Sequence, residues 1–176
     1  VVQCMQENLA ERLTEIMKKY HVAPAQINLE ITETAAAHSD MLENNIKILH
    51  KQGIEFSLDD YGSGYSNTDY LFRFPFRIVK IDKTILWEAF KNEKAMIALR
   101  NTIRMIKELG LEIVVEGVEN QEYVDYLTEQ HCDYLQGYFY SKPIPDRDFL
   151  ELLRRENAQY YAERFSKNEL SDIITT

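Results

Sequence analysis

Two adjacent aspartates, Asp59 and Asp60, end an apolar run of the sequence and are followed at once by the glycine-containing segment Tyr61-Gly62-Ser63-Gly64. Carboxylate oxygens are the ligands that hard divalent ions such as Mg²⁺ and Mn²⁺ prefer. Neighbouring side chains of a regular strand point to opposite faces, so we expect the strand to end between the aspartates and the chain to turn at Asp60. Both carboxylates could then converge on metal ions. Taken alone, the same residues fit an acidic turn, which is the more frequent interpretation.

Two further charged residues lie inside apolar segments. Glu30 shares the polar face of a predicted strand with Asn28 and Thr32, and Lys80 interrupts the apolar residues of another predicted strand. A buried charge without a partner is costly, so each of these side chains needs an opposite charge. A metal ion would serve for Glu30, and an internal ion pair between Glu30 and Lys80 would serve for both. Catalytic and purely structural interpretations are both open at this point.

Glu116 and Glu119 flank Gly117-Val118 directly after the apolar run at residues 113–115. Acidic residues are also common where a helix begins, because they interact favourably with the helix dipole. The pair alone therefore fits a helix entry equally well. What favours a functional site is that acidic residues accumulate at the ends of successive predicted strands.

The spacing of apolar residues predicts strands that alternate with helices. The predicted strands are residues 27–32, 54–59, 77–82, 112–116 and 134–136. The predicted helices are one before Pro24, then 41–52, 67–72, 93–109 and 121–129, and one from 146 past 153. This alternation implies parallel strands and the α/β class. Because each strand ends on polar residues, we predict a (β/α)8 barrel, in which strand ends meet at one rim. Five strands in 176 residues are fewer than a barrel needs, so we expect part of it to be missing.

The composition excludes several classes of partner. A formal net charge of -9 argues against binding to DNA, RNA or anionic membranes, which requires clustered basic residues. Divalent ions between carboxylates and phosphates would still allow a small phosphorylated ligand to bind. No apolar run is long enough to span a membrane, so we expect a soluble protein without membrane contact. Cys4 and Cys132 lack the spacing of a metal site, which suggests reduced thiols and a cytoplasmic location.

Five segments in a fixed order resemble the EAL family of bacterial cyclic-di-GMP phosphodiesterases. They are Leu29-Glu30-Ile31-Thr32-Glu33, Asp59 to Ser66, Lys80-Ile81-Asp82, Glu116-Gly117-Val118-Glu119 and Gln136-Gly137-Tyr138. The resemblance implies the family's TIM-like barrel and hydrolysis of cyclic-di-GMP to linear pGpG. It also implies a partial EAL domain over residues 1–155, followed by a C-terminal extension over residues 156–176.

The resemblance assigns roles to nine residues by their positions in these motifs. The ligands of a two-metal site for Mg²⁺ or Mn²⁺ would be Glu30, Asp59 and Asp60, with Asp59 bridging the two ions. The residues that act on the attacking water or support catalysis would be Lys80, Glu116 and Glu119. The residues that bind substrate or support the loop after Asp60 would be Glu33, Asp82 and Gln136.

The family's E-x-L glutamate and N-x-S asparagine, which bind one of its metals, have no counterpart in these 176 residues. We therefore expect the 176-residue chain itself to hydrolyse cyclic-di-GMP negligibly. The alternative is a degenerate EAL domain that acts as a cyclic-di-GMP receptor or protein-interaction module without turnover. The resemblance further implies a homodimer, and upstream sensor or GGDEF domains as partners.

Overall fold

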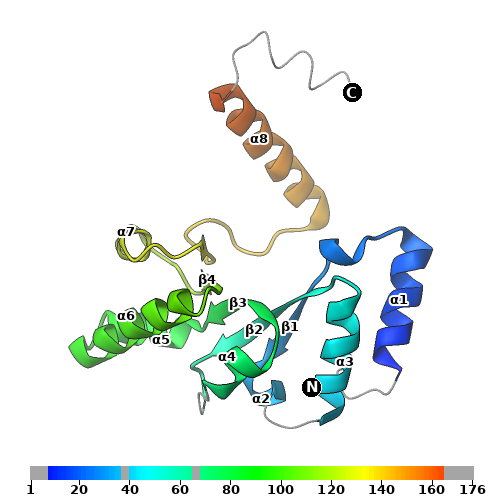
Figure 1. Ribbon diagram of the computed structural model, residues 1–176. Coiled ribbons are helices and arrows are strands. Elements are labelled where there is room, and N and C mark those ends of the chain that lie inside the picture. The colour runs from blue at the N-terminus through cyan, green and yellow to red at the C-terminus, as the bar shows by residue number, and fades with distance from the viewer. Residues whose placement is uncertain (1–7, 37–39, 65–67, 165–176) are drawn as a thin grey trace. The chain divides into compact units, whose positions relative to one another are not determined.

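The computed structural model describes residues 8–36, 40–64 and 68–164 of the chain (Figure 1). They belong to two compact units, the first ending at Tyr140 and the second beginning at Ser141. The second unit contains one long helix, α8 (Asp146–Arg164), where the sequence predicted a helix from residue 146 onward. All the residues with predicted functional roles lie in the first unit. The domain end predicted at residue 155 stays a prediction.

The first unit is built on one parallel, five-stranded sheet in the order β1-β2-β3-β4-β5. Its strands are β1 (Asn28–Thr32), β2 (Glu55–Tyr61), β3 (Phe76–Ile81), β4 (Glu112–Val115) and β5 (Tyr134–Leu135). Because all neighbours are parallel, the carboxyl ends of the strands lie along one edge of the sheet. The predicted α/β class with parallel strands is confirmed. The strand order follows the chain without a reversal, as in the wall of a barrel and unlike a doubly wound sheet.

Helices precede the first strand and connect the strands that follow. They are α1 (Leu9–Tyr20), η1 (Pro24–Gln26), α2 (Glu33–Ala36), α3 (Asp40–Lys51), α4 (Asp69–Arg73), α5 (Lys83–Ala89), α6 (Glu93–Glu108) and α7 (Gln121–Glu129). Local sequence sets their ends: Asn92 and Asn120 cap α6 and α7 by accepting backbone hydrogen bonds of 2.9 Å. None of the helices described is long and apolar enough to cross a membrane.

The core forms where α6 and neighbouring helices cover the sheet. Leu58, Val79 and Ile113 of three successive strands are fully buried, as are Leu99 and Ile106 of α6. Each such side chain contributes about 1.5–3 kcal/mol relative to leaving it exposed. This packing holds the central strands in a fixed register, so the polar residues at their carboxyl ends are presented from a rigid frame.

Helix α5 is an element that apolar spacing did not predict. Its seven residues follow β3 through Asp82, whose side chain accepts a 2.9 Å hydrogen bond from the backbone N–H of Thr84. Leu86 and Ala89 are its buried residues. A helix of about two turns shows too few repeats of the 3.6-residue period to be recognised by pattern alone. The Asp82 cap is the local signal that marks its beginning.

Candidate metal centre

The carboxyl ends of successive strands bring five of the predicted site residues together. Glu30 lies on β1, Asp59 and Asp60 on β2, Lys80 on β3, and Glu116 directly after β4. The backbone N–H of Glu116 donates to Ile81 O at 3.0 Å, which extends the pairing of β3 and β4 beyond the end of β4. Glu116 is therefore positioned by the sheet rather than by a free loop.

Lys80 lies at the centre of this group. Its ammonium is 2.8 Å from Asp59 Oδ1 and 2.9 Å from Glu116 Oε1. It is also 3.1 Å from Glu30 Oε1, whose side chain is 52% exposed and forms the outer side of the group. The structure thus contains the predicted Glu30–Lys80 ion pair, but Lys80 contacts two further carboxylates. One ammonium cannot balance three carboxylates, so the group retains an excess of negative charge that can bind further cations.

Asp60 reaches the same side as Asp59 through an irregularity of β2. The strand continues to Tyr61, and its register against β3 shifts between Leu58 and Tyr61. Asp60 has a φ of 57°, in the left-handed region that Asp and Asn tolerate better than other non-glycine residues. The prediction that the strand ends between the two aspartates is therefore wrong. A bulge within the strand, rather than its end, redirects the second side chain.

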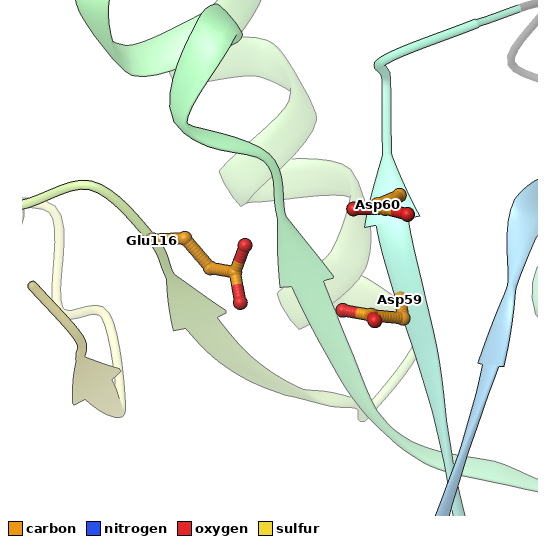
Figure 2. A group of neighbouring side chains, drawn as sticks. All are labelled: Asp59, Asp60 and Glu116. Atoms are coloured by element: carbon orange, nitrogen blue, oxygen red, sulfur yellow. The ribbon is translucent and has the colours of Figure 1, made fainter. Parts of the chain in front are cut away.

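The three carboxylates of Asp59, Asp60 and Glu116 have the spacing of a cation site. One oxygen from each lies within 4.8 Å of the others, and Figure 2 shows them on the two sides of β3. An ion that binds oxygens at about 2.0–2.6 Å can contact ligands up to about 5 Å apart. The number, chemistry and spacing of these oxygens therefore fit a divalent ion.

The environment of Asp60 favours a cation beside it. Burial raises the pKa of its carboxyl group above the ordinary value, and the charges of Asp59 and Asp82 raise it further. The positive charge of Lys80 opposes this effect without cancelling it. The ionised form of Asp60 is thus disfavoured in the protein alone, and a bound divalent ion would relieve this cost.

Glu33 lies outside the central group but contacts its loop. It begins α2, is buried, and accepts a 3.2 Å hydrogen bond from the backbone N–H of Gly62. This bond ties the segment after Asp60 to the segment after β1. Residues 65–67, the end of the predicted loop, lie outside the described residues, so the loop-supporting role of Glu33 stays a prediction.

Asp82 also lies beside the group rather than in it. Its carboxylate is buried and caps α5, where it accepts hydrogen bonds from the backbone N–H and the hydroxyl of Thr84. Its charge nevertheless contributes to the raised pKa of Asp60. The arrangement places Asp82 as a support for the elements around the site, while its predicted role toward substrate or loop stays a prediction.

The remaining two predicted residues, Glu119 and Gln136, are exposed and lie beside Glu116. The amide Nε2 of Gln136 donates to Glu116 Oε1 at 3.5 Å. Both residues line a cavity of about 230 Å³, together with Lys83, Trp87, Glu116, Gly117, Gly137 and Tyr138. Sequence reasoning missed Lys83 and Trp87 because they lie on α5, the helix that periodicity did not predict. Gly137 and Tyr138 were noted only as parts of a motif.

Gly137 allows two backbone segments of the cavity wall to touch. A Cβ atom at this position would lie 2.0 Å from Val118 O and 2.3 Å from Val118 N. Backbone hydrogen bonds join the same segments, from Val118 N–H to Gln136 O at 3.1 Å and from Phe139 N–H to Val118 O at 3.0 Å. Only glycine permits this approach.

We therefore expect Gly137→Ala to lower the free energy of unfolding by about 3 kcal/mol, because the backbone of Val118 must move. Urea denaturation followed by circular dichroism measures this value. Gly64→Ala is the matched control: a Cβ there meets nothing within 4 Å, so its effect should stay within about 0.5 kcal/mol. Equal stabilities of the two variants would contradict the close contact.

Comparison with known proteins adds to this geometry. The family model described as EAL domain matches residues 2–143 of the chain. The chain is 34% identical over 145 residues to the cyclic di-GMP phosphodiesterase RocR of Pseudomonas aeruginosa, covering 81% of this chain and 37% of RocR. It is also 34% identical over 145 residues to the probable cyclic di-GMP phosphodiesterase PdeA of Escherichia coli, covering 82% of this chain and 20% of PdeA. This chain thus spans a minor part of these relatives.

Solved structures show the same fold. The EAL domain of Mycobacterium smegmatis DcpA superposes with a TM-score of 0.80 at 30% identity, over 88% of this chain and 70% of that one. The PaMucR phosphodiesterase in complex with c-di-GMP gives a TM-score of 0.79 at 28% identity, over 84% of this chain and 60% of that one. Klebsiella pneumoniae BlrP1 with manganese and cyclic-diGMP gives a TM-score of 0.71 at 26% identity, over 77% of this chain and 35% of that one. The predicted TIM-like fold of the EAL type is confirmed, with this sheet as part of the barrel. The chain belongs to the EAL domain family.

Proposed function

We propose that this chain carries part of a metal-dependent active site that hydrolyses cyclic di-GMP to linear pGpG. The observation that supports this most is the convergence of Glu30, Asp59 and Glu116 on the ammonium of Lys80 at the carboxyl edge of the sheet. The relatives named as cyclic di-GMP phosphodiesterases support the choice of substrate. A homodimer and upstream sensor or GGDEF domains are further parts of this proposal that rest on the resemblance. A cytoplasmic location is another part, which rests on the spacing of the two cysteines.

The proposed metal ligands are Glu30, Asp59 and Asp60, and Glu116 would bind a metal-bound water or accept its proton. Mg²⁺ or Mn²⁺ at such a two-metal site supplies a more acidic water and stabilises the negative charge that develops on the phosphate. The excess of carboxylates over basic groups at this edge suits ions of this charge. A solved relative contains manganese together with cyclic-diGMP.

Lys80 would act as a charged hydrogen-bond donor. Burial alone would lower the pKa of its ammonium, but hydrogen bonds to Asp59, Glu116 and Glu30 outweigh burial and raise it. Lys80 therefore keeps its proton at neutral pH and cannot serve as a general base. It can hold the carboxylates in place and orient a water or a phosphate oxygen. Glu116, 2.9 Å from Lys80, is the acceptor through which the proton of the attacking water can leave.

The overall reaction adds one water to the cyclic dinucleotide. The water oxygen attacks one phosphorus, the bond from that phosphorus to the 3′ oxygen breaks, and the 3′ oxygen takes up a proton. The product is a linear dinucleotide with a 5′ phosphate, as pGpG requires. Glu119 and Gln136 line the cavity beside Glu116 and would support the bound dinucleotide.

The proposal is tested by complementing the chain. An N-terminal EAL segment that contains the E-x-L and N-x-S motifs is joined ahead of Val1. With Mg²⁺ or Mn²⁺, this joined protein should convert cyclic di-GMP to pGpG, as followed by chromatography. The 176-residue chain alone should be slower by at least about 100-fold, because even indirect metal contacts are worth 10–100-fold.

Two outcomes of this experiment would decide against parts of the proposal. Fast turnover by the 176-residue chain would show that the missing motifs are dispensable. A folded joined protein that binds cyclic di-GMP without turnover would favour the alternative, a receptor or interaction module.

A further inference from the structure

Trp87 on α5 contacts the loop that carries Glu116 and Glu119. Its indole Nε1–H donates a 2.8 Å hydrogen bond to the backbone carbonyl of Gly117, the residue that follows Glu116. The chain contains one tryptophan, and none of the motifs shared with the EAL family includes it. Trp87 and Gly117 both line the cavity beside Glu116. The hydrogen bond thus joins a helix to the backbone of the proposed active site.

A second contact fixes the same loop residue against the same helix. Gly117 has a φ of 72°, and a Cβ atom there would lie 2.3 Å from Lys83 Cβ and 3.1 Å from Trp87 Nε1. The loop backbone therefore lies directly on the first turn of α5. With one hydrogen bond and one close contact, the peptide after Glu116 has little freedom to rotate.

Helix α5 is itself firmly attached to the sheet. Asp82, two residues after Lys80, caps it, and Leu86 is fully buried beneath it. At its other end the ring of Phe90 lies 4.5 Å from that of Tyr123 on α7. The same continuous segment, β3 followed by α5, therefore carries both Lys80 and Trp87.

Glu116 and its neighbour are thus held from two sides. Lys80 contacts the carboxylate of Glu116 at 2.9 Å, and Trp87 contacts the carbonyl of Gly117 at 2.8 Å. We infer that Trp87 is a positioning residue, which orients the Glu116–Glu119 loop toward the metal centre through its hydrogen bond to the backbone carbonyl of Gly117. This inference rests on the proposed metal site and adds a residue to it.

Removing the indole N–H leaves the Gly117 carbonyl without this donor, and the loop gains freedom to turn. Outer partners of metal ligands typically contribute 10–100-fold to metal affinity. Because Trp87 acts through the backbone, we expect its loss to lower the metal affinity by about tenfold, the lower limit of that range. The loop amides should also lose protection, since Val118 N–H and Phe139 N–H donate the bonds that hold the loop to the next segment.

The experiment uses the 176-residue chain and Trp87→Phe, which keeps an aromatic ring but removes the donor. Hydrogen exchange of the Val118 and Phe139 amides should become about tenfold faster, while Ile54, whose amide bonds to Leu49 O, should not change. Mn²⁺ binding, measured by electron paramagnetic resonance of the free ion, should weaken about tenfold. If the phenylalanine variant packs poorly, Trp87 is replaced by benzothienylalanine, which keeps the indole shape without the N–H. This variant should show the same faster amide exchange and weaker Mn²⁺ binding.

Phe90→Leu is the matched control, because it weakens the packing of α5 against Tyr123 and Tyr126 without touching Gly117. It should lower the melting temperature but leave the loop amides and Mn²⁺ affinity unchanged. Unchanged exchange and unchanged Mn²⁺ affinity in both Trp87 variants would overturn the inference. If the wild-type chain does not bind Mn²⁺, the affinity is measured on the joined protein. Lack of binding there would refute the proposed metal site, and the exchange rates would still decide the role of Trp87.

Discussion

Replacing Lys80 by methionine is expected to lower the free energy of unfolding by about 3 kcal/mol when divalent ions are chelated. Methionine has a similar unbranched shape, so the loss reflects charge rather than volume. The Lys80 side chain is only 10% exposed and pairs with three carboxylates. Without it, Asp59 and Glu116 are left as close, unbalanced negative charges. Chemical denaturation in EDTA measures the loss.

The same variant should respond more strongly to metal than the wild-type chain does. Mn²⁺ can neutralise the carboxylates that Lys80 no longer balances, so it should raise the melting temperature of Lys80→Met more than that of the wild type. Lys91→Met is the control, because Lys91 is 69% exposed and lies 4.0 Å from its partner Glu88. Its effect should stay within about 0.5 kcal/mol. Equal stability of Lys80→Met and Lys91→Met in EDTA would show that the ion pairs of Lys80 do not stabilise the fold.

Asp60→Asn is expected to reduce cyclic di-GMP hydrolysis by the joined protein at least about 100-fold, because it removes a proposed metal ligand. Asparagine is chosen because it tolerates the φ of 57° at this position, where alanine would add strain. Asp125→Asn, a change of an exposed carboxylate on α7, should leave the rate unaltered. A rate near that of the wild type for Asp60→Asn would refute the metal role of this residue.

Without metal, the same substitution should stabilise the chain at pH 7. The pKa of Asp60 is raised in the folded state, so folding favours its protonated form. The stability linked to this group is present below the unfolded pKa of about 3.9 and is lost as the pH rises through the folded pKa. Asparagine stays neutral at every pH. The advantage of Asp60→Asn in EDTA should therefore exist at pH 7 and disappear below about pH 4.

The sequence alone was sufficient to predict that strands alternate with helices and to identify the polar residues at the strand ends. Side-chain periodicity is a local property, and long elements such as α3 and α6 repeat it often enough to be recognised. Parallel strands then place Glu30, Asp59 and Lys80 at one edge, because their carboxyl ends coincide. The five ordered motifs also predicted the EAL family, and the match of the EAL domain model to residues 2–143 confirms this prediction.

Other features depend on contacts between distant segments, and no local pattern encodes them. The left-handed conformation of Asp60 follows from how β2 pairs with β3, and this pairing is absent from the strand taken alone. The three ion pairs of Lys80 require β1, β2 and the end of β4 to meet around it. The contact between Trp87 and Gly117 spans 30 residues and starts from a helix too short to be seen in the sequence. Local sequence determined which groups could do chemistry, whereas tertiary packing decided their distances and orientations.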